Sequence, residues 1–230
     1  MSSPSMVAQG LAVLLNAHHA VYIEVPKVAC SSIKIALAGI LGIDLAAAGG
    51  DPHKARFPAP VSRHIGPALY PGLFTFGFVR NPWDRLVSCY RDKVLGEASD
   101  FTSFDASRGV AHCLARFDAF RADMSFDDFV RAVAMIPDEV ADVHFRSQCT
   151  FVTNVCSDIA IDFLGRFESL ARDFRMVSDK LGLPSLTLPR VQAASTPRRY
   201  TEYYTPETRS IVATRFRKDV ELFGYEFGSQ

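Results

Sequence analysis

The sequence has no long hydrophobic run and no excess charge of either sign. No stretch reaches the roughly 18 apolar residues that a membrane-spanning helix needs, so we expect no integral membrane segment. Lys plus Arg and Asp plus Glu both number 25, which gives zero formal net charge. A protein that binds nucleic acid over a broad surface would normally be basic. We therefore expect no nucleic-acid partner, and any anion site must be a local cluster of charge.

Cysteine is scarce and irregularly spaced. The sequence contains Cys30, Cys89, Cys113, Cys149 and Cys156. An odd number of cysteines does not suit a disulfide framework, and no CxxC pair or His/Cys cluster has the spacing of a zinc site. The N-terminus also lacks the basic start of a signal peptide. These features predict a cytoplasmic protein with free thiols and no metal.

Strand-like and helix-like segments alternate along the chain. Apolar runs at residues 20–25 and 73–79 indicate two buried strands. Each run precedes a helix: the first is expected to be capped by Ser31 or Ser32, and the second by Asn81, with Pro82 at the first helical position. Both segments are therefore strand–loop–helix units.

The rest of the chain continues the alternation. Further elements are expected as a helix opened by Ser125, a strand at 159–164, a helix at 168–181 and a final helix at 205–223. Residues 44–72 and 95–123 have little periodicity and are predicted to be loops. The pattern predicts an α/β protein with a three-layer α/β/α, P-loop-like fold around a central, mostly parallel sheet. We expect one domain over residues 1–230.

The loop after the first strand carries the first candidate site, within the segment PKVACSSIK at 26–34. A strand-to-helix loop points backbone N–H groups at one spot, where the helix dipole favours phosphate. Lys27 adds a full charge, and Ser31 and Ser32 add hydroxyl donors. The phosphate-loop order GxxxxGK[ST] is absent. A plain turn with an exposed lysine explains these nine residues equally well.

The loop after the second strand carries the second candidate site, within RNPWDRLVSCY at 80–90. Arg80 follows a strand end, where ligands bind in open α/β sheets, and Ser88 lies about two helical turns further on. An arginine there can bind phosphate bidentately, with the serine as a second donor. Taken alone, this segment has a simpler interpretation. Arg80 would pair with a carboxylate, and Arg85 would lie on a solvated face.

Taken together, the two segments resemble the PAPS-binding elements of sulfotransferases, where PAPS is 3′-phosphoadenosine-5′-phosphosulfate. They are most like those of the carbohydrate sulfotransferases (family 2 type) that modify chondroitin, dermatan and the HNK-1 glycan. That family has approximately PKxGCTxxK on the 5′-phosphosulfate and RxPxxRxxSxY on the 3′-phosphate. GRFESLARDF at 165–174 and the segments YYTPE and FGY near the C-terminus also fit. The resemblance spans roughly residues 21–227.

The resemblance implies a role for each candidate residue. Lys27 would stabilise the charge on the departing phosphate, as a positioned cation does in phosphoryl transfer. The residues that would hold the 5′-phosphate are Lys27, Val28, Ala29, Cys30, Ser31 and Ser32. Arg80 and Ser88 would hold the 3′-phosphate. Arg198 and Arg199 would complete the nucleotide site, although a solvated basic turn explains them as well.

The acceptor hydroxyl needs a base, and histidine is the usual choice near neutral pH. His64 is favoured, because a related uronosyl sulfotransferase branch carries its base in the corresponding loop. His144 is the second candidate. The acceptor itself is expected to be a carbohydrate or a small hydroxylated compound, and the oligomeric state is open.

Three departures from the family pattern stand out. Ala29 replaces the usual glycine, so the loop either avoids a positive φ there or tolerates strain. Asn81 replaces the common aspartate, and no membrane stem is present, which puts the Golgi setting of the family in doubt. Cys30 lies at an expected helix N-terminus, where thiol pKa values fall, but the resemblance implies a packing role.

Two other functions compete with sulfuryl transfer from PAPS. One is a P-loop-type kinase or NTPase that uses Lys27 and Ser31 on ATP, although the expected GK[ST] order and a clear Mg²⁺-binding acidic strand end are missing. The other is a non-catalytic protein that binds a nucleotide or an anionic glycan. Measuring activity after substitution of Lys27 distinguishes the non-catalytic binding protein from an enzyme.

Overall fold

The computed structural model describes residues 12–59, 72–97, 102–154, 158–183, 188–189 and 199–229. They form two compact units. The first unit ends at Val79 and resumes over Gln148–Pro189, and the second contains Arg80–Ser147 and the chain from Arg190 onward. The prediction of one domain over 1–230 stays a prediction.

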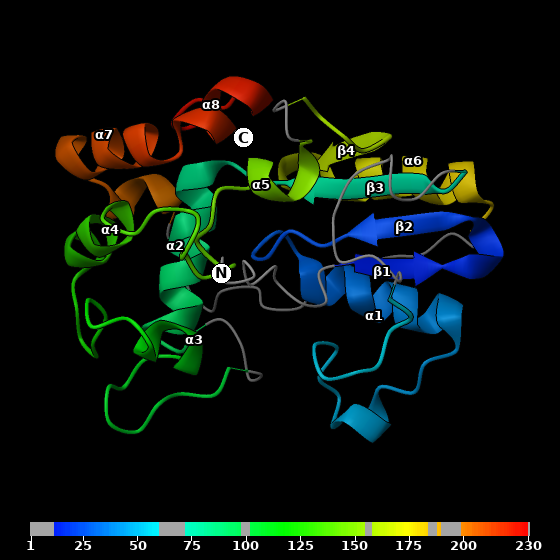
Figure 1. Ribbon diagram of the computed structural model, residues 1–230, viewed down its shortest axis with the longest axis horizontal. Coiled ribbons are helices and arrows are strands. Elements are labelled where there is room, and N and C mark those ends of the chain that lie inside the picture. Colours follow the sequence, from blue (N-terminus) through cyan, green and yellow to red (C-terminus); the bar gives the residue numbers. More distant parts are fainter. Residues whose placement is uncertain are drawn as a thin grey trace, which may run out of the picture. The chain divides into compact units, whose positions relative to one another are not determined.

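A four-stranded sheet forms the centre of the first unit (Figure 1). Its strands, in spatial order, are β1 (Ala12–Leu15), β2 (Ala20–Ile23), β3 (Phe74–Val79) and β4 (Phe163–Arg166). β1 pairs antiparallel with β2, whereas β2–β3 and β3–β4 are parallel. All four residues of β2 are buried, as expected for a strand with both faces covered.

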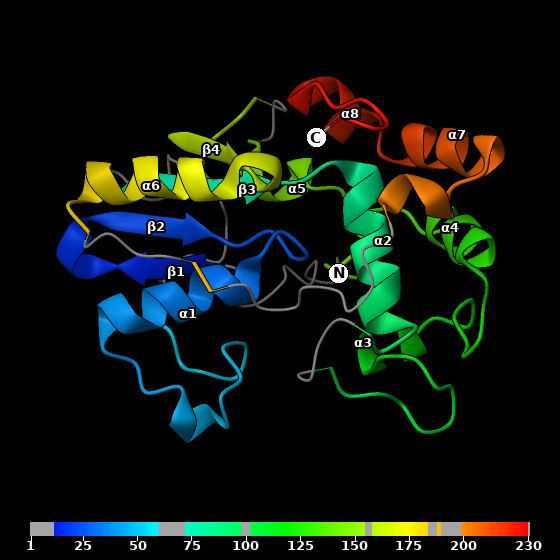
Figure 2. The same cartoon turned by 180° about the vertical axis from the view of Figure 1, so that it is seen from behind.

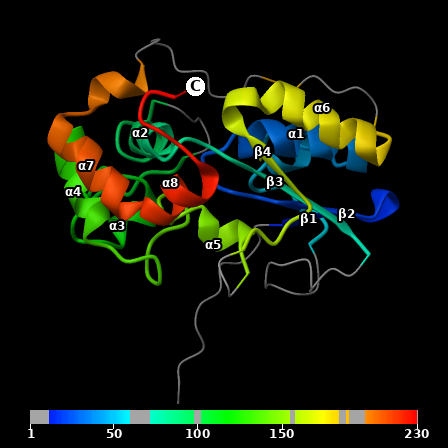
Figure 3. The same cartoon turned by 90° about the horizontal axis from the view of Figure 1, so that it is seen from above.

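Helices cover one face of this sheet. α1 (Cys30–Leu41) and α6 (Leu170–Leu181) lie on the same face, as Figures 2 and 3 show. The unit also contains η1 (Asn16–His18), η2 (Ala46–Ala48), α5 (Cys149–Val152) and η4 (Phe167–Ser169). The α/β class and the mostly parallel sheet are confirmed, whereas the three-layer, P-loop-like arrangement is not.

The second unit consists of helices. They are α2 (Pro82–Lys93), α3 (His112–Ala115), α4 (Phe126–Ala134), η5 (Tyr200–Tyr203), α7 (Pro206–Arg215) and α8 (Arg217–Phe223). α4 and α7 lie side by side (Figures 1 and 3). Phe120, Phe129 and Phe145 are fully buried and pack ring against ring, which gives this unit its own core.

The expected helix ends are largely confirmed. Asn81 caps α2 by accepting a hydrogen bond from the Trp83 amide, with Pro82 at the first position. The Ser125 side chain caps α4, and Gly182 ends α6 in the left-handed conformation that glycine adopts without strain. These ends depend on residues directly adjacent to the helices in the sequence.

Other boundaries differ from the expectations. α1 begins at Cys30 with Ala29 as its N-cap, so neither Ser31 nor Ser32 caps it. The strand expected at 159–164 lies at β4, a few residues later. The final helix is broken between α7 and α8 at Phe216, whose φ of −108° and ψ of 28° leave the helical region while its ring stays buried. β1 was not anticipated from the sequence.

The cysteines that the structure describes, Cys30, Cys89, Cys113 and Cys149, are all free thiols, as expected. Within the described ranges, no helix combines the length and the apolar character that crossing a membrane requires.

Two glycines give a matched test of the packing. A Cβ at Gly165 in β4 would overlap the ring of Phe78, so Gly165→Ala should lower the free energy of unfolding by about 2 kcal/mol. A Cβ at Gly39, inside α1, would meet nothing within 4 Å. Gly39→Ala should therefore raise the free energy of unfolding by about 0.5–1 kcal/mol. Urea unfolding measures both, and equal stabilities of the two variants would contradict this packing.

Candidate functional site

The loop from β2 to α1 has an unusual backbone. Lys27 has a φ of 68° and Ala29 a φ of 54°, so two non-glycine residues occupy the left-handed region within three positions. Turns of this kind group backbone N–H groups into anion-binding concavities. No side chain caps α1, so its first amides and the positive end of its dipole face the same loop. The loop tolerates strain at Ala29.

The side chains around this loop are buried and charged. Lys27 keeps only 8% of its surface exposed, and Ser31 and Ser32 in the first turn of α1 are buried as well. The alternative of a plain turn with an exposed lysine is therefore wrong. A buried lysine just before a helix whose first amides have no side-chain cap is a local source of positive charge in a chain with no net charge.

A buried ion pair ties the end of β2 to α1. The Lys34 Nζ lies 2.6 Å from Glu24 Oε2, and both side chains are almost fully buried. Burying a charge is tolerated when an opposite charge compensates it. The pair fixes the second turn of α1 against the residue that directly follows β2.

His53 lies against this pair, although no sequence motif singled it out. Its Nε2 is 2.8 Å from the Ser31 Oγ, its Nδ1 is 3.4 Å from Lys34 Nζ, and Nδ1 is 3.8 Å from Glu24 Oε1. The loop after η2 returns to the start of α1 and brings this histidine there. The only signal in the sequence was its position in the long loop at 44–72.

The possible metal-ligand atoms of Glu24, Cys30 and His53 lie within 4.8 Å of one another. The Lys34 ammonium already lies among them, at 2.6 Å from the carboxylate. A divalent cation there would be repelled by the ammonium, so the donor set does not favour a metal. The expectation of no metal stays a prediction.

Cys30 behaves as a packed thiol. Burial, and after it the carboxylate of Glu24, raise the pKa of Cys30 to about 11, although Lys27 and Lys34 act in the opposite direction. The lowering expected from a helix N-terminus is therefore outweighed. The thiol is protonated at neutral pH, in keeping with a packing role.

In the second unit, Arg80 precedes α2 and pairs with a carboxylate. Its Nε donates to Asp84 Oδ2 at 2.8 Å, one turn into the helix. This is the contact that the simpler interpretation proposed. The guanidinium has five N–H donors and this contact uses one of them, so the pairing is compatible with a further contact to an anion.

Arg85 does not lie on a solvated face. It is buried and donates to the carbonyl oxygens of Arg146 at 2.7 Å and Val143 at 3.0 Å. Burial lowers the pKa of Arg85 from its ordinary value, although nearby carboxylates, Asp219 foremost, raise it. Arg85 therefore holds the 143–146 segment against α2.

Asn81 joins the start of α2 to the C-terminal segment. Its Oδ1 accepts from the Trp83 amide at 3.1 Å, while its Nδ2 donates to the Glu226 carbonyl at 2.9 Å. An aspartate caps a helix equally well but has no N–H to donate. The departure from the family pattern at this position is thus explained by a second hydrogen bond.

The remaining predicted nucleotide residues are only partly described. Ser88 lies half-buried on α2, and Arg199 is the exposed N-cap of η5. Arg198 lies outside the described residues, as does His64, the favoured base. The structure therefore leaves the roles of both untested.

His144, the second candidate base, is held by a carboxylate. Its Nδ1 lies 2.6 Å from Asp142 Oδ1, and its backbone N–H donates to the same oxygen at 3.0 Å. Burial raises the pKa of Asp142, but the hydrogen bonds from His144 outweigh it and leave the pKa below its ordinary value. A carboxylate on Nδ1 orients a histidine for proton transfer at Nε2.

Cys113 lies beside this dyad, and its possible ligand atom is within 4.8 Å of those of Asp142 and His144. Burial, and then Asp142, raise the pKa of the Cys113 thiol to about 12. Arg116 also lies 3.7 Å from Asp142. The carboxylate is therefore already partnered, and the thiol stays protonated at neutral pH.

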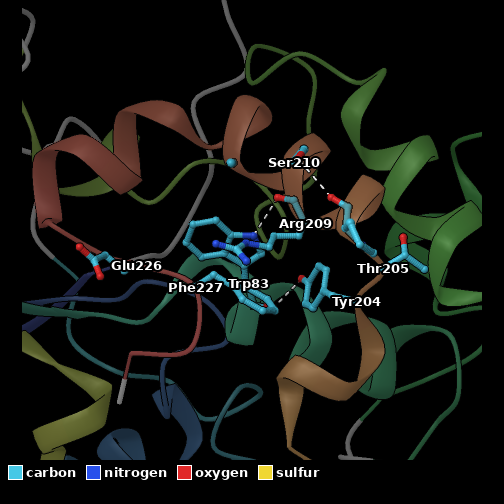
Figure 4. Close-up of a pocket in the computed structure, with 9 residues that line it drawn as sticks. Trp83, Tyr204, Thr205, Arg209, Ser210, Glu226 and Phe227 are labelled. Atoms are coloured by element: carbon cyan, nitrogen blue, oxygen red, sulfur yellow. Dashed lines mark hydrogen bonds between the residues drawn. The ribbon is translucent and has the colours of Figure 1, made fainter.

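A cavity of about 700 Å³ lies beside the start of α2 (Figure 4). Its lining includes the aromatic residues Trp83, Tyr204 and Phe227 and the charged residues Arg209 and Glu226. The Arg209 guanidinium stacks 4.7 Å from the centre of the Phe227 ring. The C-terminal segment thus contributes Glu226 and Phe227 to the lining of this cavity.

Comparison with known proteins places the chain. A family model described as the sulfotransferase family matches residues 12–226, which is most of the chain. The chain belongs to the sulfotransferase family. Carbohydrate sulfotransferase 8 of Mus musculus is 27% identical over 231 residues, covering 90% of this chain and 54% of that protein. Carbohydrate sulfotransferase 14 of Danio rerio is 27% identical over 249 residues, covering 93% and 62%.

The chain thus spans roughly half to three-fifths of the length of these relatives. No solved structure gives a significant match to it. Family membership agrees with the resemblance drawn from the two loop segments, and the structure gives this sulfotransferase-family chain a buried lysine in the first of them.

The two hydrogen bonds of Asn81 can be separated by substitution. Asn81→Asp keeps the helix cap but leaves the Glu226 carbonyl without the Nδ2 donor, so the free energy of unfolding should fall by about 1–2 kcal/mol. Ser125→Asp exchanges one good cap for another at an exposed helix start and should change it by less than about 0.5 kcal/mol. Urea unfolding of both variants provides the check. An unaltered Asn81→Asp stability would show that the bond to Glu226 contributes nothing.

Proposed function

We propose that this chain transfers a sulfuryl group from PAPS to a hydroxyl of a carbohydrate or another small hydroxylated acceptor. The supporting observation is the β2–α1 loop, where a buried Lys27 and uncapped helix amides surround a strained turn. The family match and the printed names of the relatives support the reaction class. The acceptor class comes from those names and is part of the proposal.

The donor would be bound through its two phosphate groups. In the first unit, Lys27 and the amides and hydroxyls from Val28 to Ser32 would hold the 5′-phosphosulfate. In the second unit, Arg80 and Ser88 would hold the 3′-phosphate, with Arg198 and Arg199 completing the nucleotide site. Each of these groups is a donor or a cation, as an anionic ligand requires.

The reaction then needs one bond made and one broken. The acceptor oxygen attacks the sulfur, the bond from sulfur to the bridging oxygen of the 5′-phosphate breaks, and its electron pair stays on the departing 3′,5′-adenosine bisphosphate (PAP). Charge grows on that oxygen, so the Lys27 ammonium stabilises the transition state more than the ground state.

A base must take the acceptor proton, and two histidines stand as candidates. His144 has support in the Asp142 contact that orients its Nδ1. His64 has the support of the resemblance alone. A large loss of kcat in His64→Asn with little change in His144→Asn would assign the base to His64, and the opposite pattern would assign it to His144.

Several finer expectations accompany this proposal. They are the three-layer, P-loop-like architecture, a cytoplasmic location and a reaction without a metal. Sulfuryl transfer of this kind requires no divalent cation when protein cations neutralise the phosphate groups. Activity that survives a strong chelator would support the last of these.

The choice of nucleotide separates this function from a kinase or NTPase. PAP at about 100 times its Kd should stabilise the folded protein by roughly 2.7 kcal/mol, a shift that thermal unfolding detects. ATP with Mg²⁺ should produce a much smaller shift, because it lacks a 3′-phosphate for Arg80. Stronger stabilisation by ATP with Mg²⁺ would overturn the proposal.

Removal of Lys27 tests the catalytic role. Lys27→Ala should lower kcat about 10²–10³-fold, because the charge on the departing phosphate loses its cation. Lys218→Ala, on the exposed side of α8, removes the same charge from the chain and should leave kcat unchanged. Labelled PAPS with a panel of sugar acceptors measures both. Full activity in Lys27→Ala would contradict this role for Lys27, whereas PAPS binding without any transfer by the unsubstituted protein would favour a non-catalytic binding protein.

A further inference from the structure

Four polar side chains from three segments meet beside the first two turns of α1. Glu24 follows β2, Ser31 and Lys34 belong to α1, and His53 comes from the loop after η2. The contacts are Lys34–Glu24 at 2.6 Å, Lys34–His53 at 3.4 Å and His53–Ser31 at 2.8 Å. Only the His53 side chain is appreciably exposed, at 36%.

The partners of His53 select one of its neutral forms. An ammonium group has only hydrogens to offer, so Lys34 presents a donor to Nδ1 and that nitrogen must offer its lone pair. The ring proton of neutral His53 is then on Nε2, which donates to the Ser31 Oγ. A serine oxygen that accepts this bond donates its own proton in another direction.

The loop itself holds the ring in place. The His53 backbone N–H donates to Asp51 Oδ1 at 2.8 Å, a side-chain turn of the kind that aspartate favours. Asp51 is buried, and Lys54 lies 3.5 Å from its other oxygen. Glu24 in turn holds Lys34, so both nitrogens of the ring face groups whose positions are fixed.

We propose that His53 is a positioning residue for the donor site. By donating from Nε2 to Ser31, it sets the Ser31 hydroxyl so that its proton faces the 5′-phosphate group bound at the start of α1. Lys34 and Glu24 fix the tautomer that makes this possible. The proposal rests on the proposed function, because it assigns Ser31 to the donor phosphate.

Two near-isosteric substitutions separate this role from others. The amide nitrogen of Gln reaches the position of Nε2 and can still donate to Ser31, whereas that of Asn reaches only the position of Nδ1. His53→Asn should raise the Kd for PAP and the KM for PAPS about tenfold with little change in kcat, as expected when a hydrogen bond to a charged group is impaired. His53→Gln should stay within about twofold of the unsubstituted protein.

A double-mutant cycle checks that the effect passes through the serine. Ser31→Ala should weaken PAP binding about as much as His53→Asn, and the double variant should be no weaker than Ser31→Ala, because the two residues act as one unit. Additive losses would overturn the proposal, as would a His53→Gln variant as weak as His53→Asn. A large fall in kcat with unchanged PAP affinity in both variants would instead make His53 the base.

The tautomer gives a readout that needs no ligand. Nitrogen-15 NMR of the His53 ring should show the proton on Nε2 in the free protein at a pH where the ring is neutral. A proton on Nδ1 would overturn the proposal even if PAP binds as expected. Failure of the unsubstituted protein to bind PAP, with the proton on Nε2, would instead refute the proposed function and the phosphate assignment of Ser31 with it.

Discussion

The parallel pairing of β2 with β3 is the constraint on which the first unit depends. The register joins Ala20 to Phe74 and Ile23 to Gly77, so both strands end at the same edge of the sheet. The approach is close, since a Cβ at Gly77 would lie 3.0 Å from the Ile23 carbonyl oxygen. Both candidate loops directly follow these strands, so the strand ends determine where the side chains and amides of the loops lie.

The loop at the end of β2 contains strained backbone that lowers the stability of the fold. Left-handed backbone at a non-glycine residue costs on the order of 1–3 kcal/mol, and the chain carries it at both Lys27 and Ala29. The loop persists because its apolar residues, Val25 and Val28, are fully buried. A glycine at position 29 would relieve part of this strain, so the alanine makes the loop stiffer and its amides better fixed.

In both units, a buried carboxylate lies next to a histidine and a basic side chain. Glu24 and Lys34 compensate each other beneath the first loop, and Asp142 lies 2.6 Å from His144 Nδ1 and 3.7 Å from the Arg116 guanidinium. Neither carboxylate belonged to the motifs that suggested a function. Both hold a histidine in place, and a fixed ring can serve either proton transfer or the orientation of a neighbouring hydroxyl.

The sequence by itself determined what depends on neighbouring residues. β2 and β3 follow from their apolar runs, the cap at Asn81 follows from its side chain, and the helix end at Gly182 follows from the left-handed backbone that glycine adopts without strain. The two loop segments were singled out by their resemblance to sulfotransferase motifs, and the family match over residues 12–226 agrees with that resemblance, while the roles of their residues stay predictions. These features need no knowledge of distant contacts.

Only the tertiary structure decided the features that join distant residues. The pairing of His53 with Ser31, the bond from Asn81 to Glu226 and the burial of Arg85 against Val143 connect residues 22 to 145 positions apart. No local pattern encodes them, because a hydrogen bond across the fold depends on where two loops return. The tertiary structure also put the N-cap of α1 at Ala29, since a strained turn held by buried side chains overrides the preference for serine caps.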